Sequence, residues 1–325
     1  MINPKCDFTS LTTRQIIDAD FTMDSPEPLI KPFNTFIVAD PSVLTPENSH
    51  DGRWHMFFHT TLGVYHFDSS DGLSFNNRGK IVSDAMRPDI NYIDGEYYLF
   101  YERTRNLLMN GLNIIGLAKW ESEIYCKKSS DLKAWSVSWP VIRQSREYEK
   151  AGKGYSISNP FLFSDGNKNR LYYSCSLTYI KDCGFCEPTY ISYAESDRTD
   201  KNYRSAQSPI ISPDKNSEYL NLCSGCLKVY KTSDGYIGIQ NGIYEKDGKS
   251  HSAIMLLSSD DGLNFRFERV LVQPGMFKNA DWMKQYVYAS CLVRYGSELR
   301  LYFNGRDTSS IIRGRECIGY VKANI

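Results

Sequence analysis

Three carboxylic acids stand beside short apolar runs, where acids are locally unfavourable. Asp40 interrupts the run 36–44 and is followed by Pro41, Glu187 precedes Pro188, and Glu102 ends the aromatic run 96–102. Asp disfavours strands and Pro cannot donate to a strand ladder, so Asp40 should lie at the beginning of a strand, at the rim of a sheet. Carboxyl groups gathered at one rim are suited to general acid–base catalysis.

The sequence around Asp40 is repeated along the chain. Four later stretches have the same shape, at 85–90, 157–162, 222–227 and 288–293. A second strand follows each of these stretches, and a third strand ending in a Ser/Asp turn follows in most of them. The equivalent residues of the five units are Pro41, Pro88, Pro160, Gly225 and Ser290, which by subtraction lie 47, 72, 65 and 65 positions apart. Periods of this size built from four strands are typical of propeller blades.

These units predict an all-β fold, a five-bladed β-propeller of four-stranded antiparallel blades that forms one domain over residues 1–325. The last unit ends after its third strand, at 317–321. Residues 28–32 match the outer strand 209–213 in sequence. We therefore expect the N-terminal arm, residues 1–32, to complete the last blade and close the ring, which removes exposed sheet edges.

Polar residues recur where first strands begin and second strands end, which in a propeller is one face of the central channel. The candidates for substrate binding on this face are Arg87, Arg103, Asn159, Asn241, Asn304, Arg306, Asp307 and His59. Asp89 should point the same way as Arg87, two residues deeper in the channel. We include Asp89 as a catalytic candidate beside the alternative of a structural hydrogen-bonding role.

Three short motifs resemble one known group of enzymes. They are Asp-Pro at 40–41, Arg-Pro-Asp at 87–89 and Ile-Ser-Tyr-Ala-Glu-Ser-Asp at 191–197. They look like the five-bladed β-propeller glycoside hydrolases, which include the family 32, 43, 62, 68, 117 and 130 enzymes. The resemblance covers nearly the whole chain and implies a carbohydrate substrate, with Asp40 as general base or nucleophile.

The chain departs from that group at two positions that usually carry acids. Asn159-Pro160 stands where the family 43 pattern has Asp-Pro, and residues 223–226 stand where it has Glu-Xaa-Pro. Glycoside cleavage needs a proton donor and a second carboxylate across the scissile bond. Our hypothesis is that Asp40 is the base and that Glu187 or Glu102 is the acid. The alternatives are a strand cap for Asp40, a solvated loop residue for Glu187 and a rim salt bridge with Arg103 or Arg105 for Glu102.

The leading functional hypothesis is a glycoside hydrolase, and two others stay open. One is a phosphorylase or sugar transferase in which arginines hold phosphate, and the other is a carbohydrate-binding propeller without catalysis. Arg87, Arg103 and Arg306 could bind an acidic sugar, a phosphate or only neighbouring carboxylates.

Composition and charge narrow the possible partners. Lys plus Arg and Asp plus Glu both number 38, so no charge excess indicates nucleic acid or an anionic membrane. No run approaches the roughly 18 apolar residues of a membrane span. Residues 1–6 lack the apolar core of a signal peptide, and the nine cysteines are an odd number. These observations favour reduced thiols and a cytoplasmic protein.

Two Cys-x2-Cys pairs, Cys183 with Cys186 and Cys223 with Cys226, could together hold zinc tetrahedrally. The 36 residues between the pairs exceed the spacing in common zinc ribbons. We prefer the interpretation of free buried thiols, and we predict no metal and no cofactor.

Overall fold

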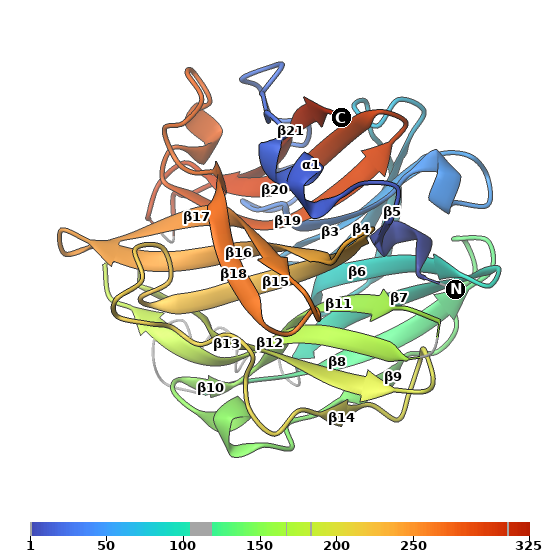
Figure 1. The fold of residues 1–325 in the computed structure, drawn as a ribbon, viewed down its shortest axis with the longest axis horizontal. Coiled ribbons are helices and arrows are strands. Elements are labelled where there is room, and N and C mark those ends of the chain that lie inside the picture. Colours follow the sequence, from blue (N-terminus) through green and yellow to red (C-terminus); the bar gives the residue numbers. More distant parts are fainter. Residues whose placement is uncertain (1, 105–118, 167, 183, 311) are drawn as a thin grey trace.

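The computed structural model of the chain describes residues 2–104, 119–166, 168–182, 184–310 and 312–325. Its strands form five mainly antiparallel sheets arranged as the blades of one ring (Figure 1). The prediction of an all-β, five-bladed propeller is confirmed.

The blades follow one another along the chain. The first consists of β2 (Ala39–Leu44), β3 (Trp54–Thr60), β4 (Gly63–Ser69) and β5 (Asn76–Val82). The second consists of β6 (Ala85–Ile93), β7 (Glu96–Thr104), β8 (Trp120–Ser129) and β9 (Trp139–Ile142), with β10 (Gly154–Tyr155) parallel to β8. The third consists of β11 (Ile157–Ser164), β12 (Asn169–Ile180), β13 (Phe185–Ser196) and β14 (Arg204–Ser205).

The fourth blade consists of β15 (Cys223–Thr232), β16 (Tyr236–Lys246), β17 (Lys249–Ser259) and β18 (Phe265–Val272), with β1 (Asp7–Phe8) parallel to β15. The fifth consists of β19 (Tyr286–Tyr295), β20 (Glu298–Arg306) and β21 (Glu316–Asn324). The helical elements are α1 (Thr13–Asp18), η1 (Pro4–Cys6), η2 (Pro46–Asn48), η3 (Glu147–Lys150) and η4 (Asp281–Met283). Within the described ranges, none of the helices has the length and apolar character needed to cross a membrane.

A β-bulge interrupts the inner strand of every blade near its beginning. The register shifts lie at 39–42, 86–89, 158–161, 223–226 and 287–290. In the first three blades the bulge contains a residue in the left-handed region followed by proline: Asp40, Arg87 and Asn159, with φ of 55°, 50° and 49°. Proline fits here because a bulge leaves one residue outside the ladder. Such strained positions cluster at functional sites, where they re-aim a side chain.

The fifth blade is joined to the first by two side chains of β20. Tyr302 Oη donates to the carbonyl of Gly72 at 2.9 Å, and Arg300 Nη1 donates to the carbonyl of Asp71 at 2.9 Å. Gly72 belongs to the Ser/Asp turn that follows β4. Arg170 and Tyr172 on β12 make the equivalent contacts with the turn of the fourth blade. The ring is therefore closed partly by contacts between neighbouring blades.

In the described part of the N-terminal arm, the backbone pairs with the outer edge of β21 at two isolated positions. Thr22 bridges Lys322, and Ile30 bridges Ile318 with hydrogen bonds of 3.0 Å in both directions. No continuous fourth strand forms here among the described residues, because the prolines within 28–32 have no backbone N–H to donate. The predicted outer strand at 209–213 of the third blade is likewise reduced to a bridge between Ile191 and Ile211.

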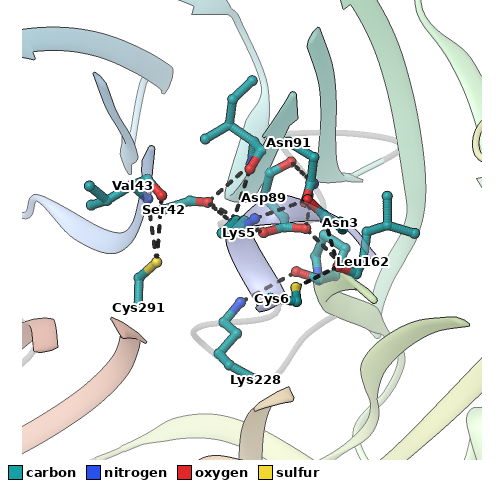
Figure 2. Close-up of polar contacts among 12 residues, drawn as sticks. Asn3, Lys5, Cys6, Ser42, Val43, Asp89, Asn91, Leu162, Lys228 and Cys291 are labelled. Atoms are coloured by element: carbon teal, nitrogen blue, oxygen red, sulfur yellow. Dashed lines mark hydrogen bonds and ion pairs between the residues drawn. The ribbon is translucent and has the colours of Figure 1, made fainter. Parts of the chain in front are cut away.

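Residues 3–6 lie against the inner strands of the first three blades, a feature that the sequence did not predict. Lys5 Nζ donates to Asp89 Oδ1 at 2.5 Å and to Ser42 Oγ at 2.8 Å (Figure 2). The other oxygen of Asp89 accepts from the backbone N–H of Leu162 and from Asn91 Nδ2, both at 2.8 Å. These partners belong to β2, β6 and β11, so a single ion pair links three blades.

Replacing Lys5 with methionine should reduce stability by about 3–5 kcal/mol, because it leaves the charge of Asp89 buried without its partner. Both side chains are almost inaccessible, at 1% and 0% exposure. Chemical denaturation measures the loss. The matched control is Lys31→Met, which breaks the exposed ion pair with Glu27 and should leave the unfolding midpoint unchanged. Equal midpoints for the two variants would contradict the structural role of Lys5.

The first blade contains a buried pair of histidines that should make stability dependent on pH. His55 Nδ1 and His66 Nε2 lie 3.0 Å apart, and burial together with the charge of His55 lowers the pKa of His66 to about 3. An unfolded histidine has a pKa of about 6.5. Below that pH, His66 is protonated in the unfolded chain but stays neutral in the folded chain. The free energy of unfolding therefore falls as pH drops from about 6.5 toward 3.

The expected result is a melting temperature that decreases steadily between pH 7 and pH 4.5. In His66→Gln the glutamine side chain cannot be protonated, so the melting temperature should depend less steeply on pH. The carboxylates titrate in both proteins and contribute equally to the two slopes. If the two proteins show the same slope, His66 is not the cause.

Candidate active site

One pocket of about 360 Å³ opens on the face of the propeller where the inner strands begin. All five blades contribute to its wall. Most of the predicted site residues line it, namely Asp40, His59, Arg87, Asn159, Glu187, Asn241, Asn304 and Arg306. These residues meet because the propeller topology brings the beginnings of first and third strands and the ends of second strands to one face.

Asp40 is held in the pocket by contacts from both neighbouring strands. His59 at the end of β3 places Nδ1 at 3.1 Å from Asp40 Oδ2, and the backbone N–H of Asp40 donates to Asn304 Oδ1 at 3.1 Å. Burial alone would raise the pKa of Asp40, but the hydrogen bond and charge of His59, with the charge of Arg87, outweigh it and lower the pKa below its ordinary value. Asp40 is therefore ionised at neutral pH.

Glu187 has the opposite electrostatic environment. It lies near the beginning of β13, is half-buried and lines the same pocket as Asp40. Burial raises its pKa to about 8; the charge of Arg87 opposes this shift, and the negative charges of Glu316 and Asp40 add to it. At neutral pH Glu187 therefore carries a proton that it could donate.

A third carboxyl group in the pocket, Glu316, was missed by the sequence analysis. It is the first residue of β21 and pairs across the ladder with Arg306. Arg306 Nη1 donates to Glu316 Oε1 at 2.7 Å, and Asn304 Nδ2 donates to its Oε2 at 3.0 Å. Burial raises the pKa of Glu316 despite these contacts. The signal that could have found it is its position, since third strands begin at the pocket, as the strand of Glu187 does.

Glu102, one of the predicted acids, is placed behind the pocket wall and does not line it. Its side chain is fully buried; it pairs with Arg87, which lines the pocket, and accepts from Trp120 Nε1 at 3.0 Å. A proton donor must reach the substrate, so this position does not suit the acid. The alternative of a salt bridge predicted Arg103 or Arg105 as the partner, but the observed partner is Arg87, and Arg105 lies outside the described residues.

Three further candidates also lie outside the pocket. Asp89 is buried in the cluster around Lys5, where it has no access to a substrate. Arg103 is exposed, and its guanidinium lies over the ring of Tyr125 at 5.3 Å from the centroid. Asp307 accepts a backbone hydrogen bond from its own loop. These positions correct the sequence-based assignment of the three residues to the site.

The fourth blade has no acid at residues 223–226, where the family 43 pattern has Glu-Xaa-Pro. Gly225 occupies this part of the wall with φ of 61°, and a Cβ atom there would lie 2.2 Å from the backbone oxygen of Asn241. Only glycine fits this close approach. Asn241 is itself fixed by a hydrogen bond of 3.1 Å from Nδ2 to the carbonyl of Val287. Asn159, at the second departing position, lines the pocket as an amide.

The cysteines near the pocket do not form a recognisable metal site in the described part of the chain. Cys186 and Cys226 line the pocket, Cys223 is buried beside it, and Cys183 lies outside the described residues. Among the residues that the structure describes, no group of three or more His, Cys, Asp or Glu side chains is arranged to hold a metal ion.

Comparison with known proteins finds similarity in structure alone. No protein-family model and no curated protein matches the sequence. An N-acetylgalactosamine deacetylase from F. plautii, in complex with blood group B trisaccharide, has a TM-score of 0.66 at 12% identity, over 100% of this chain and 96% of that one. A family 117 glycoside hydrolase from Zobellia galactanivorans has a TM-score of 0.58 at 12% identity, over 99% and 91%. A family 43 endo-arabinanase from Bacillus licheniformis has a TM-score of 0.56 at 13% identity, over 90% and 96%.

The chain has the fold of the five-bladed propeller glycoside hydrolases. The resemblance inferred from the three short motifs is confirmed at the level of the fold. Propeller enzymes of this fold differ in the reactions they catalyse, so the activity has to be argued from the pocket itself.

Proposed function

We propose that the protein is a glycoside hydrolase in which Glu187 is the general acid and Asp40 the general base. The observation that carries the proposal is one pocket lined by two carboxyl groups whose surroundings push their pKa values apart. Acid and base roles are commonly separated in this way at neutral pH. The glycoside hydrolases among the structural neighbours support the same reaction class.

In the proposed reaction the protonated carboxyl of Glu187 donates to the glycosidic oxygen as the C–O bond breaks. A water molecule then forms the new bond at the sugar carbon and gives its proton to Asp40, whose carboxylate His59 orients. The charge of Arg87 favours the carboxylate that Glu187 becomes after donation. Glu316 adds negative charge beside Glu187 and so helps to keep the proton on it.

The arginines support hydrolysis over transfer to phosphate. Arg306 donates to Glu316, to the carbonyl of Thr308 at 2.9 Å and to that of Ser310 at 2.7 Å. Arg87 pairs with Glu102 behind the wall. Both guanidinium groups thus serve neighbouring carboxylates, one of the three roles that the sequence left open. We propose a substrate without phosphate or acidic groups.

Activity assays on a panel of aryl glycosides and oligosaccharides, with and without inorganic phosphate, test this function. The expected result is hydrolysis at the same rate in both conditions. Products formed as sugar phosphates only when phosphate is present would indicate a phosphorylase. Binding of sugars without any turnover would indicate a carbohydrate-binding propeller.

A further inference from the structure

A second, smaller cavity of about 110 Å³ adjoins the pocket and lies between the second and third blades. The two cavities share Arg87, Phe185 and Cys186 in their walls. Trp120 at the beginning of β8 and Tyr179 near the end of β12 complete the aromatic lining of the second cavity. A ligand in the pocket can therefore extend into the second cavity along a continuous wall.

The lining of the second cavity is mainly apolar. The side chain of Tyr179 is 47% exposed. An aromatic ring stabilises a protein mainly through the area that it buries, so this exposed ring contributes little to the fold. Its strand position pairs it with Cys186, which lies next to Glu187 on β13. Tyr179 thus stands at the rim of the second cavity, on the side of the proposed proton donor. A concave site lined by aromatic side chains with a charged group in its wall has the composition of a small-ligand pocket.

The second cavity is also held rigid by a group that supports the first. One oxygen of the buried Glu102 accepts from Trp120 Nε1 at 3.0 Å, and the other pairs with Arg87. A single carboxylate therefore fixes one wall residue of each cavity. Side chains fixed before the ligand arrives lower the entropy that binding costs.

We propose that the second cavity binds the sugar unit adjacent to the one in the pocket, so that the substrate is an oligosaccharide or another glycoside with a sugar leaving group. The carbohydrate chemistry of this inference rests on the proposed function. One face of a sugar ring consists of C–H groups, which pack on aromatic rings, while its edge presents hydroxyl groups. Trp120, Tyr179 and Phe185 supply the aromatic surface for the C–H face.

Calorimetric titration tests the inference, with methyl glycosides and homodisaccharides of glucose, galactose, mannose, xylose and arabinose as probes. The Asp40→Asn protein prevents turnover during the measurement. At least one disaccharide should bind about tenfold or more tightly than the methyl glycoside of the same sugar. Tyr179→Ala should remove most of that difference, and Tyr179→Phe should retain it. Phe267→Ala, which removes an aromatic ring of 52% exposure on β18, is the matched control and should change nothing.

Equal affinity for disaccharides and methyl glycosides would overturn the inference. So would a failure of every disaccharide to bind, or a preference that Tyr179→Ala leaves intact. Turnover by the wild-type protein separates this result from the proposed function. Tighter disaccharide binding without hydrolysis would contradict only the proposed function. Hydrolysis of aryl glycosides without a preference for disaccharides would contradict only the inference about the second cavity.

Discussion

Replacing Asp40 with asparagine should lower kcat by at least roughly 10²–10⁴-fold, the effect typical of losing general-base catalysis. The amide cannot take the proton of the attacking water. It fills the same volume and can still accept from His59, so substrate binding should persist and the melting temperature should change little. Steady-state kinetics and thermal melts on the wild-type and Asp40→Asn proteins measure these effects.

Asp307→Asn is the matched control for this prediction. Asp307 lies on the same face as Asp40 but outside the pocket, so its replacement should leave kcat unchanged. If Asp40 were only a cap for its strand, asparagine would serve equally well, since it also caps. Turnover near the wild-type level in Asp40→Asn would therefore exclude the catalytic role and favour a sugar-binding propeller.

Glu187→Gln should have the second large effect, and the effect should depend on the leaving group. In a disaccharide the second sugar is a poor leaving group that needs the proton, so hydrolysis should fall by roughly 10²–10⁴-fold. In a nitrophenyl glycoside the leaving group is nitrophenolate, a stabilised anion, so hydrolysis should be slowed much less. Comparing kcat for both substrates in wild type and variant measures the difference. An equal loss on both would contradict the role of Glu187 as proton donor.

The pH profile of the wild-type protein provides a second test of Glu187. The acid must be protonated, and its pKa is raised to about 8, so kcat/KM should fall as pH rises through about 8. Asp40 must be ionised, and its pKa is lowered, so the acidic limb should lie below the usual range of an aspartate. Glu316→Gln removes a negative charge beside Glu187 and should move the alkaline limb to lower pH. An alkaline limb that stays in place would show that Glu316 does not act on Glu187.

The sequence predicted the blades well because each strand carries its own local signal. Alternating apolar residues, Ser/Asp turns and the prolines after Asp40, Arg87 and Asn159 mark elements whose geometry depends on nearby residues. Asp40 was found because an acid and a proline are unfavourable inside a strand. Its contact with His59 follows from the pairing of neighbouring strands.

The errors arose where the local pattern is broken or where the partner is remote. Asp89 was expected to point the same way as Arg87, but the bulge at 86–89 changes the alternation and turns Asp89 toward Lys5. No local pattern reveals that Lys5, 84 positions away, is its partner. Glu316 was missed because the last strand was expected to begin at Cys317, one residue later than it does.

The position of the N-terminal segment has a consequence for the order in which the protein acquires its structure during synthesis. Residues 2–30 are translated before their partners: Lys5 needs Asp89, β1 pairs with Lys231 and Thr232, and Thr22 bridges Lys322. Asp89 is made soon afterwards, whereas Lys322 is made only after the inner strands of all five blades. The native contacts of this segment are thus completed only when the fifth blade has been made. Nascent chains must keep this segment, which includes the apolar Phe8 and Ile16, from associating elsewhere until the ring is complete.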